Sequence, residues 1–343
     1  MPSSATATAA VSLPQASAAF TQALPTSALT AAYQDMCLWR RFEERAAQMY
    51  MQGKIFGYFH TYNGQEAILA GMNLVKRPTD DIITSYRCHA HTISSGISAK
   101  AVMAELCGRR DGVSGGKGGS MHMFNPEGHY WGGHGIVGAQ VGLGAGLAFA
   151  NKYMGRDDVC ITKYGDGAAN QGQVFESMNY AALWGIPVLF VIENNQYGMG
   201  TAVCRASAGA GQLCKRGEAL GIPGEKVNGQ DVFAVAEATA RALNYMRANM
   251  KPYIIEFDTY RYYGHSKSDP GKYRTKEEVE DWQTNRDPII TLGKYLVAER
   301  GIKQAQLDAW DEAAKAEALA AAEFADASPQ PDPSVHTTHV MPE

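Results

Sequence analysis

The clearest hydrophobic pattern in the chain is a strand–helix–strand unit between residues 159 and 192. Val159–Tyr164 is mostly apolar and β-prone, which is typical of a buried strand. Ala168–Trp184 lacks proline and repeats apolar residues at helical spacing, and Pro187–Ile192 is a second apolar run. Two strands joined by such a helix are expected to be parallel, with a right-handed crossover. The chain is therefore predicted to be an α/β protein with a mainly parallel sheet.

The same patterns predict further elements on both sides of this unit. A broad apolar stripe predicts a helix over 29–53. The other predicted elements are strands over 81–86 and 253–260 and helices over 64–74, 99–106, 140–153, 231–248 and 276–324. The Gly-rich stretch 108–135 has no periodicity and is too long for a plain connector, so we expect it to be a functional loop.

Composition divides the chain into an arm, one domain and a tail. Residues 1–28 are rich in Ala, Ser, Thr and Pro and contain no Lys or Arg, so we predict a disordered or loosely held arm. Residues 29–328 are predicted to form a single domain, because 343 residues with 45% apolar content suit one large α/β domain. Residues 329–343 follow as a tail that begins with three prolines in five residues.

Charge, cysteine usage and hydropathy exclude several classes of function. A net charge of -4 gives no indication of nucleic-acid binding. Six cysteines without CxxC spacing argue against a zinc site or a disulfide scaffold and favour a reducing compartment. No apolar run reaches membrane-spanning length, and the first 28 residues lack the basic residues of a secretory signal or a mitochondrial transit peptide. We therefore expect no membrane partner and a location in a bacterial cytoplasm rather than a mitochondrial matrix.

Two polar motifs stand directly after the two strands of the central unit. Gly165-Asp166-Gly167 follows the first strand, and Asn194-Asn195 follows the second. Ligands of open parallel sheets bind at the carboxyl ends of the strands. Carboxylate and amide oxygens suit Mg²⁺, and a backbone carbonyl near Tyr197 is a third candidate ligand. Glycines allow a phosphate to approach the backbone, and the N-terminus of the following helix favours an anion. The alternative is an ordinary turn and strand end, since the same residue types form turns.

Several separated motifs resemble one enzyme family. Gly165–Gly172 and Glu193–Thr201 resemble the thiamine diphosphate motif of 2-oxo acid dehydrogenases. Further matching stretches are Tyr58–Glu66, Ser85–His89, Gly115–Met123, Gly135–Gln140 and Tyr260–Pro270. From about Tyr33 to about Phe324, the chain is most similar to alpha subunits of the pyruvate dehydrogenase first component. The resemblance implies a thiamine diphosphate-binding fold, with a mainly parallel sheet flanked by helices on both faces.

The resemblance also implies an activity. It is the thiamine diphosphate-dependent oxidative decarboxylation of pyruvate, with reductive acetylation of the lipoyl group of dihydrolipoamide acetyltransferase, which yields acetyl-CoA in the full complex. Alpha subunits of acetoin dehydrogenase or branched-chain 2-oxo acid dehydrogenase are the alternatives, and acetoin relatives share the loop Gly264–Asp269. Asn195–Thr201 and Tyr260–Tyr263 favour pyruvate. A cofactor-free assembly subunit is a further alternative, against which the intact motifs argue.

The family's functional residues carry over to matching positions of this chain. The resemblance assigns cofactor contacts to Tyr86, Arg87, Gly135, Val137, Asp166, Gly167, Ala168, Asn195, Tyr197 and His265, with Mg²⁺ ligands at Asp166, Asn195 and Tyr197. From the residues alone, an arginine such as Arg87 more often forms a surface salt bridge than a diphosphate clamp. Val137 is expected to wedge the two rings of the cofactor into a bent shape, although a strand-to-helix turn explains the same residues.

Two histidines are the expected catalytic residues. The family pattern places His60 opposite the reactive carbon of the cofactor and His265 in a mobile loop that orders around the cofactor. Histidine suits proton transfer near neutral pH. The alternatives are a packed core residue for His60 and a polar surface loop for His265. In animal relatives, the serine that matches Ser266 is phosphorylated, and a dianion there would repel the diphosphate.

Three other histidines invite a metal assignment that the sequence does not favour. His122, His129 and His134 lie in the Gly-rich stretch without fixed spacing, so we expect no zinc site there. In animal relatives, the position of His134 is commonly Asn, which leaves this histidine without an assigned role.

The resemblance implies that this chain holds only half of an active site. Thiamine enzymes need a carboxylate on a ring nitrogen of the aminopyrimidine, and in this family that glutamate belongs to a separate beta subunit. The expected assembly is therefore a heterotetramer of two alpha and two beta subunits. Glu66 is the rival for that carboxylate within this chain. Its simpler interpretation is an acidic residue in the first turn of a helix.

Overall fold

We describe the chain from a computed structural model that covers residues 13–338 and residue 340. The predicted arm of residues 1–28 lies partly outside this range. Within it, Ala18–Ala23 forms helix α1, and the next helix begins at Thr26. The Ser17 hydroxyl donates a hydrogen bond of 2.6 Å to Glu237 Oε1. The described part of the arm is therefore largely helical and attached to the domain, which differs from the loosely held arm that the sequence predicts.

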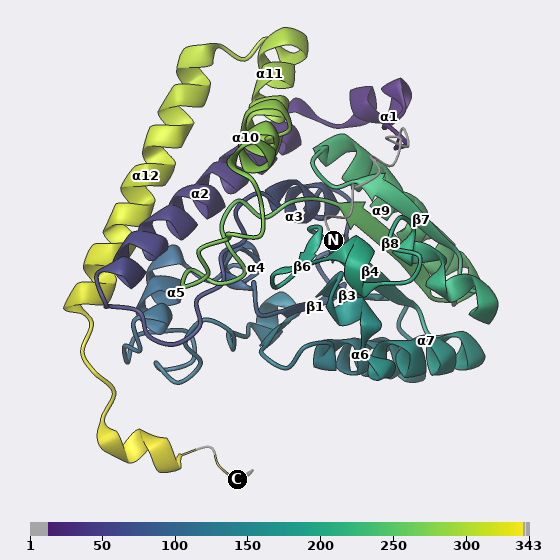
Figure 1. Ribbon diagram of the computed structural model, residues 1–343, viewed down its shortest axis with the longest axis horizontal. Helices are drawn as coiled ribbons and strands as arrows, with labels where there is room; N and C mark the ends of the chain where they lie inside the picture. Colours follow the sequence, from purple (N-terminus) through teal and green to yellow (C-terminus); the bar gives the residue numbers. More distant parts are fainter. Residues whose placement is uncertain (1–12, 339, 341–343) are drawn as a thin grey trace, which may run out of the picture.

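A six-stranded parallel sheet forms the centre of the molecule (Figure 1). The strand order is β2-β1-β3-β4-β8-β7. The strands are β1 Asp81–Ser85, β2 Tyr130–His134, β3 Cys160–Gly165, β4 Val188–Asn194, β7 Gly224–Asn228 and β8 Tyr253–Asp258. β3 and β4 pair in parallel, with Cys160 opposite Val188 and Gly165 opposite Glu193. This pairing confirms that the two strands of the predicted strand–helix–strand unit are parallel neighbours.

Helices cover both faces of the sheet, as the predicted fold class requires (Figure 1). Side chains of a strand alternate between the two faces. In β4, Phe190 belongs to the core formed with α6 Ala139–Tyr153 and α7 Gly172–Trp184. Its neighbour Leu189 belongs to the opposite core, formed with α9 Val232–Asn249. Every residue of β4 is buried, which is typical of a central strand in a parallel sheet.

A second group of helices packs beside the sheet. The long helices α2 Thr26–Met51 and α12 Gln304–Ala327 pack against each other (Figure 1). The remaining elements are α3 Glu66–Asn73, α4 His89–Ser94, α5 Ala99–Leu106, α8 Val203–Ala206, α10 Lys276–Asn285, α11 Pro288–Arg300 and the hairpin of β5 Tyr197–Gly198 and β6 Thr201–Ala202. Among the residues that the structure describes, no helix is long and apolar enough to cross a membrane.

Two local predictions are wrong, and one short helix was not predicted. α7 begins at Gly172 and not at Ala168, because Gln171 is extended and Ala168–Asn170 forms a separate 3-10 turn. Within the predicted loop 108–135, Tyr130–His134 is the edge strand β2. Helix α4 was not predicted, since six residues are too few to show a helical period. These differences leave the carboxyl edge formed by β3 and β4 unaffected.

Candidate active site at the carboxyl edge of the sheet

Polar residues from adjacent strands gather at the carboxyl edge of the sheet. Asp166 follows β3, Asn195 follows β4, and Tyr197 lies in the hairpin just after it. Asp166 and Asn195 are only 2% and 6% exposed. The backbone of Asn195 is close enough to lower the pKa of Asp166. Asp166 and Asn195, two of the three residues predicted to bind a metal, therefore lie near each other at the ends of adjacent strands.

The Asp166 carboxylate is buried without a counter-ion. It takes part in none of the ion pairs formed among the described residues. Burial raises the pKa of Asp166 to about 6, and the positive charges of Arg261 and Arg87 reverse only part of this rise. An isolated buried carboxylate is costly, and a cation beside it would remove that cost. The position therefore suits a metal ion, with Asp166 as an oxygen ligand.

The amide of Asn195 is held in one orientation by two residues from distant parts of the chain. Its Nδ2 donates to Gln65 Oε1 over 3.0 Å, and its Oδ1 accepts from Arg261 over 3.2 Å. Arg261 also donates to the backbone carbonyl of Tyr197 over 2.6 Å. Because Gln65 accepts from the amide nitrogen and Arg261 donates to the amide oxygen, the Asn195 oxygen points toward Arg261 and away from Gln65. Gln65 and Arg261 were not predicted as site residues, although both lie inside motifs that carry the resemblance.

The Gly165-Asp166-Gly167 turn approaches the β5–β6 hairpin closely. A β-carbon added to Gly167 would lie 3.2 Å from the Cα of Gly198, which is tighter than an ordinary contact. Ala168 follows in the 3-10 turn and is buried. The helix N-terminus predicted directly after the motif is therefore replaced by the 3-10 turn, and α7 begins only at Gly172. A side chain at position 167 would require the hairpin backbone to move by a few tenths of an ångström.

Arg87 is buried and is not part of a surface salt bridge. It is 4% exposed and donates to two backbone carbonyls, Thr61 O at 2.8 Å and His265 O at 2.6 Å. Burial and the nearby positive charge of Arg261 together lower the pKa of Arg87 to about 10. Within residues 13–338, no carboxylate pairs with this guanidinium. A buried cation without a counter-ion suits an anionic ligand such as a diphosphate.

His60, Tyr86 and His265 form an aromatic cluster next to Arg87. The ring centroids of His60 and Tyr86 are 4.4 Å apart, and those of His60 and His265 are 5.1 Å apart. Burial and the charge of Arg87 lower the pKa of His60 to about 2 and that of His265 to about 3. Both imidazoles are therefore neutral at pH 7. His60 Nδ1 is buried without a hydrogen-bond partner among the described residues, so it is available to a ligand.

The segment that carries His265 is held by a network centred on Asp269. Asp269 accepts from the backbone N–H of His265 and from the Tyr273 hydroxyl, each over 2.7 Å. Ser266 is buried, and its hydroxyl contacts that of Ser268 at 2.9 Å. A kinase can reach the Ser266 hydroxyl only if this network opens.

Val137 lies beside the start of α7, whereas Gly135 lies next to His122. The carbonyl of Val137 accepts from Gln173 Nε2 over 3.0 Å, at the start of α7. Gly138 has a φ of 82° and forms the N-cap of α6. The Val137 side chain is 42% exposed, and that of Ile136 is 73% exposed. The Val137 side chain, which is predicted to wedge the two cofactor rings, is therefore partly exposed in the isolated chain.

The three histidines of the Gly-rich stretch do not converge. His129 lies at the amino end of β2 and contacts Asp81 at 3.1 Å, whereas His134 lies at the carboxyl end of the same strand. His122 packs near Gly135, at the carboxyl edge. In the described part of the chain, no group of three or more His, Cys, Asp or Glu side chains is arranged to hold a metal ion.

One carboxylate organises the Gly-rich loop that precedes β2. Glu105 of α5 is fully buried and accepts four hydrogen bonds from backbone N–H groups. The donors are Ser114 at 2.7 Å, Gly116 at 2.9 Å, Gly118 at 2.6 Å and Gly119 at 3.1 Å. Gly116 has a φ of 79°, a conformation that favours glycine. The loop is therefore folded around a carboxylate that a neighbouring helix supplies.

A second buried polar cluster lies further inside the sheet, on the same strands as the site. Lys163 of β3 contacts Glu193 of β4 at 2.9 Å, the Tyr62 hydroxyl at 2.9 Å and His91 Nε2 at 2.6 Å. Tyr62 also donates to Glu193 over 2.6 Å. Burial and the neighbouring Lys163 hold the pKa of His91 well below its usual range. The ammonium of Lys163 therefore has acceptors on several sides and belongs to the core.

Glu66, the rival carboxylate within this chain, is already engaged. Arg40 donates to both of its oxygens, at 2.5 Å and 2.9 Å, and the backbone N–H of Gly64 donates to one of them. Burial raises the pKa of Glu66, and Arg40 opposes that rise. A carboxylate with these three donors has a structural role at the start of α3, as the simpler interpretation predicts.

Comparison with known proteins places this geometry in one family. The dehydrogenase E1 component family matches residues 34–334. The chain is 50% identical over 310 residues to a Rhizobium meliloti protein, covering 90% of this chain and 89% of that protein. It is 50% identical to a Zymomonas mobilis protein, covering 90% and 87%, and 48% identical to a Bos taurus protein, covering 87% and 76%. All three are named pyruvate dehydrogenase E1 component subunit alpha; the bovine one is a mitochondrial somatic form. These matches confirm the resemblance, and the chain belongs to the dehydrogenase E1 component family.

Proposed function

We propose that this chain is the alpha subunit of a pyruvate dehydrogenase (acetyl-transferring). With a beta subunit, it would carry out thiamine diphosphate-dependent oxidative decarboxylation of pyruvate and pass the acetyl group to the lipoyl group of dihydrolipoamide acetyltransferase. The observation that carries the proposal is the buried pair of unbalanced charges, Asp166 and Arg87, in a chain 50% identical to named pyruvate dehydrogenase alpha subunits.

The residues at the carboxyl edge fit thiamine diphosphate with Mg²⁺. Asp166, Asn195 Oδ1 and the Tyr197 carbonyl would hold the metal, because all three are oxygen donors and Asp166 lacks a counter-ion. Arg87 would pair with the diphosphate, for which its buried and otherwise unpaired charge is suited. Gly167 and Ala168 would bring the backbone close to a phosphate.

His60 and His265 are proposed to handle protons and orient substrate. When bound, thiamine diphosphate supplies the nucleophilic carbon and the electron sink for decarboxylation. His60 and His265 stay neutral at pH 7, so each has one N–H donor and one acceptor nitrogen. Tyr86 packs against both rings and limits their rotation. Neutral imidazoles suit hydrogen bonds to a carboxylate substrate and proton exchange with it.

A beta subunit is proposed to complete the site. Glu66 is bound by Arg40 and is not free to contact a ring nitrogen. The outer surface of α6 and α7 begins beside Val137, runs to the amino edge of the sheet and exposes large apolar side chains. They include Leu143, Phe149, Tyr153, Leu183 and Trp184, which are 44–80% exposed. On α6, Gly146 has open space around its α-carbon, so another helix can approach closely. This face supports docking of a second subunit beside the half-built site.

The proposal is tested by assaying the chain after co-purification with its beta subunit. Pyruvate, branched-chain 2-oxo acids and acetoin are compared as substrates, with Mg²⁺, thiamine diphosphate and a lipoyl domain present. We expect the highest kcat/KM with pyruvate. A preference for acetoin or a branched-chain 2-oxo acid would overturn the substrate assignment, and no decarboxylation of any of them would overturn the enzyme assignment.

A further inference from the structure

The segment that carries His60 is buried but has no regular secondary structure. Residues 58–62 form neither a helix nor a strand, although His60 is 5%, Thr61 4% and Tyr62 1% exposed. Backbone N–H and C=O groups that are buried outside helices and strands need other hydrogen-bond partners. The position of the His60 imidazole therefore depends on the groups that supply those partners.

Two of the partners belong to the site itself. The Phe59 carbonyl accepts from the backbone N–H of Lys267 over 2.9 Å, and the Thr61 carbonyl accepts from Arg87 over 2.8 Å. Lys267 lies in the same loop as His265, and Arg87 also donates to the His265 carbonyl over 2.6 Å. These bonds tie the segment to the loop and to the residue proposed for the diphosphate, so they give it no reference point outside the site.

The third partner is not among the residues assigned to the cofactor or the substrate. Glu43 of α2 is 1% exposed, and its Oε1 accepts from the backbone N–H of Tyr62 over 3.0 Å. Its Oε2 accepts from Nδ1 of His89 over 2.9 Å, and Nε2 of His89 lies 2.9 Å from the Ser120 hydroxyl. One carboxylate therefore joins the His60 segment to α4 and to the Gly-rich loop.

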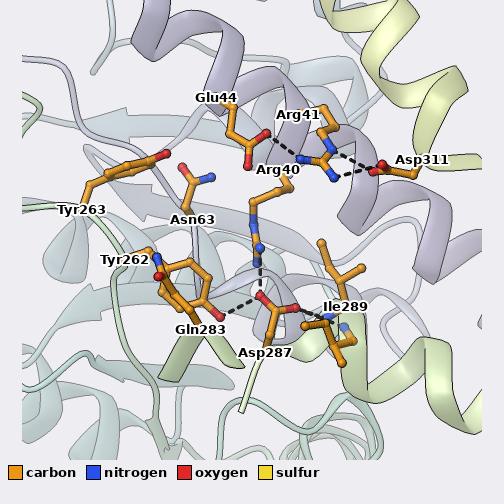
Figure 2. Close-up of a pocket in the computed structure, with 11 residues that line it drawn as sticks. Arg40, Arg41, Glu44, Asn63, Tyr262, Tyr263, Gln283, Asp287, Ile289 and Asp311 are labelled. Atoms are coloured by element: carbon orange, nitrogen blue, oxygen red, sulfur yellow. Dashed lines mark hydrogen bonds and ion pairs between the residues drawn. The ribbon is translucent and has the colours of Figure 1, made fainter. Parts of the chain in front are cut away.

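The helix that carries Glu43 is itself fixed to the rest of the domain. Arg40 donates over 2.8 Å to Asp287, the N-cap of α11 (Figure 2). Arg41 donates to both oxygens of Asp311 in α12, at 2.7 Å and 2.9 Å. A residue that positions another needs such a rigid element beneath it, because movement of the helix would otherwise be passed on.

We propose that Glu43 is a positioning residue for His60. The inference rests on the proposed function, in which His60 handles protons and orients substrate. Glu43 fixes the peptide group two residues after His60, and with it the direction of an imidazole whose ring centroid lies 5.1 Å from that of His265. Both contacts of Glu43 are hydrogen bonds, so its role depends on the reach of its two terminal atoms and not on negative charge.

The first test separates reach from charge in the assembly with the beta subunit. Glu43→Asp keeps the charge but shortens the side chain by one methylene, so the carboxylate cannot reach Tyr62 and His89 together. Glu43→Gln keeps the reach: its oxygen accepts from the Tyr62 N–H, and its nitrogen donates to Nδ1 of His89. The imidazole proton then moves to Nε2, which lies 3.1 Å from the Ser120 carbonyl.

The two variants should differ in kcat and not in cofactor affinity. Glu43→Asp should lower kcat for pyruvate at least about tenfold, and Glu43→Gln should stay within about threefold of the parent, because a small displacement of an orienting group slows the reaction. The dissociation constant of thiamine diphosphate, measured calorimetrically, should change less than about threefold in both. Unchanged kcat in Glu43→Asp would overturn the proposal. A tenfold loss in Glu43→Gln would overturn it by itself, even if Glu43→Asp does not fold.

The second test asks whether Glu43 acts through His60. In a His60→Gln background, Glu43→Asp should lower kcat by less than about twofold, because the group that Glu43 positions is already absent. Losses that multiply would show that Glu43 affects the reaction independently of His60, and the proposal would fail.

Asp81→Asn is the matched control for both tests. Asp81 is also a buried carboxylate that contacts Nδ1 of a histidine, His129 at 3.1 Å, but it lies at the amino edge of the sheet. Asp81→Asn should keep kcat within about twofold of the parent. A loss as large as that of Glu43→Asp would assign the effect to any damaged carboxylate–histidine pair and overturn the proposal.

Hydrogen exchange separates this inference from the proposed function, because it needs neither cofactor nor substrate. Without thiamine diphosphate, the Tyr62 amide should exchange at least about tenfold faster in Glu43→Asp than in the parent, and Glu43→Gln should keep the parent's protection. Parent-like protection in Glu43→Asp would overturn the inference even if the parent enzyme is active. If the parent decarboxylates no 2-oxo acid, the proposed function fails, and this exchange rate remains the test of Glu43.

Discussion

Two polar clusters on β3 and β4 differ in how completely their charges are paired. Inside the sheet, Lys163 and Glu193 form an ion pair of 2.9 Å that Tyr62 and His91 complete. Two to three residues further along the same strands, Asp166 has no counter-ion and its pKa is raised to about 6. Both clusters are buried, so exposure to solvent does not explain the difference.

The difference separates a structural cluster from a functional one. A buried charge is tolerated when partners are built in, and is costly when they are absent. The buried charge of Lys163 has a built-in partner, Glu193. The buried charges of Asp166, which is negative, and Arg87, which is positive, have no such ion-pair partner among the described residues. We infer that the unmatched charges are reserved for a ligand that carries both a metal and an anion. Substitutions in the two clusters should therefore affect different properties.

The largest expected effect is on stability, from Lys163→Met. Removing the ammonium leaves Glu193 buried beside an apolar side chain, which should cost about 3–5 kcal/mol of unfolding free energy. Urea unfolding measures it. The double variant Lys163→Met/Glu193→Gln should recover much of the loss, because no uncompensated charge remains. Equal stability of the single and double variants would show that the pairing of the two charges is not what stabilises this cluster.

Asp166→Asn should have the opposite profile. Loss of the carboxylate should lower kcat roughly 10²–10³-fold and abolish Mg²⁺-dependent binding of thiamine diphosphate in the assembly with the beta subunit. Without ligand, the variant should be as stable as the parent or more stable by about 1–3 kcal/mol at pH 7, since a raised carboxylate pKa marks a destabilising charge. A marked loss of stability without ligand would show that Asp166, like Lys163, has a structural role, and would contradict the distinction between the two clusters.

Arg261→Lys tests whether orientation of Asn195 depends on a planar guanidinium. Arg261 donates through Nη1 to Asn195 Oδ1 and the Tyr197 carbonyl, and through Nη2 to the Met199 carbonyl and the Tyr273 hydroxyl. A single ammonium cannot reproduce these four bonds at once. Apparent Mg²⁺ affinity, measured from Mg²⁺-dependent cofactor binding, should fall about 10–100-fold. Arg274→Lys is the control, because Arg274 donates to loop carbonyls of Arg261 and Tyr263 and to neither metal-ligand residue. Equal losses in both variants would indicate loop order as the cause.

The smallest effect is a pH dependence of stability from His60. Burial lowers the folded-state pKa of His60 to about 2, while the unfolded value is about 6.5. Below pH 6.5 the unfolded chain binds a proton that the folded chain does not, so stability falls as the pH is lowered. The His60→Gln variant should lose about 1 kcal/mol less than the parent between pH 6.5 and pH 5.5 in urea unfolding.

The exposed His336 provides the control for this pH test. His336→Gln also removes one imidazole, but an exposed one outside the buried cluster, and should keep the parent's pH dependence. A parent-like slope in His60→Gln would contradict the neutral buried imidazole at position 60.

The sequence predicted the carboxyl edge well because its signal is local. Asp166 and Asn195 each stand directly after an apolar run, and parallel pairing then brings them to one edge. The orienting residues were missed because their contacts are not local: Gln65 and Asn195 are 130 residues apart in the chain. Strand β2 was missed because its five residues include two glycines and its pairing partner is 48 residues earlier.

The four hydrogen bonds from the Gly-rich loop to Glu105 have an evolutionary consequence. All four donors are backbone N–H groups, so the bonds themselves do not depend on a side chain, whereas Gly116 and Gly118 leave no room for one. Substitutions at Ser114 and Lys117 can therefore change the surface that the loop presents without changing its backbone conformation. The shape instead depends on one carboxylate in another element. A lineage could change the specificity of this loop by substitutions within it while selection on its conformation acts on α5.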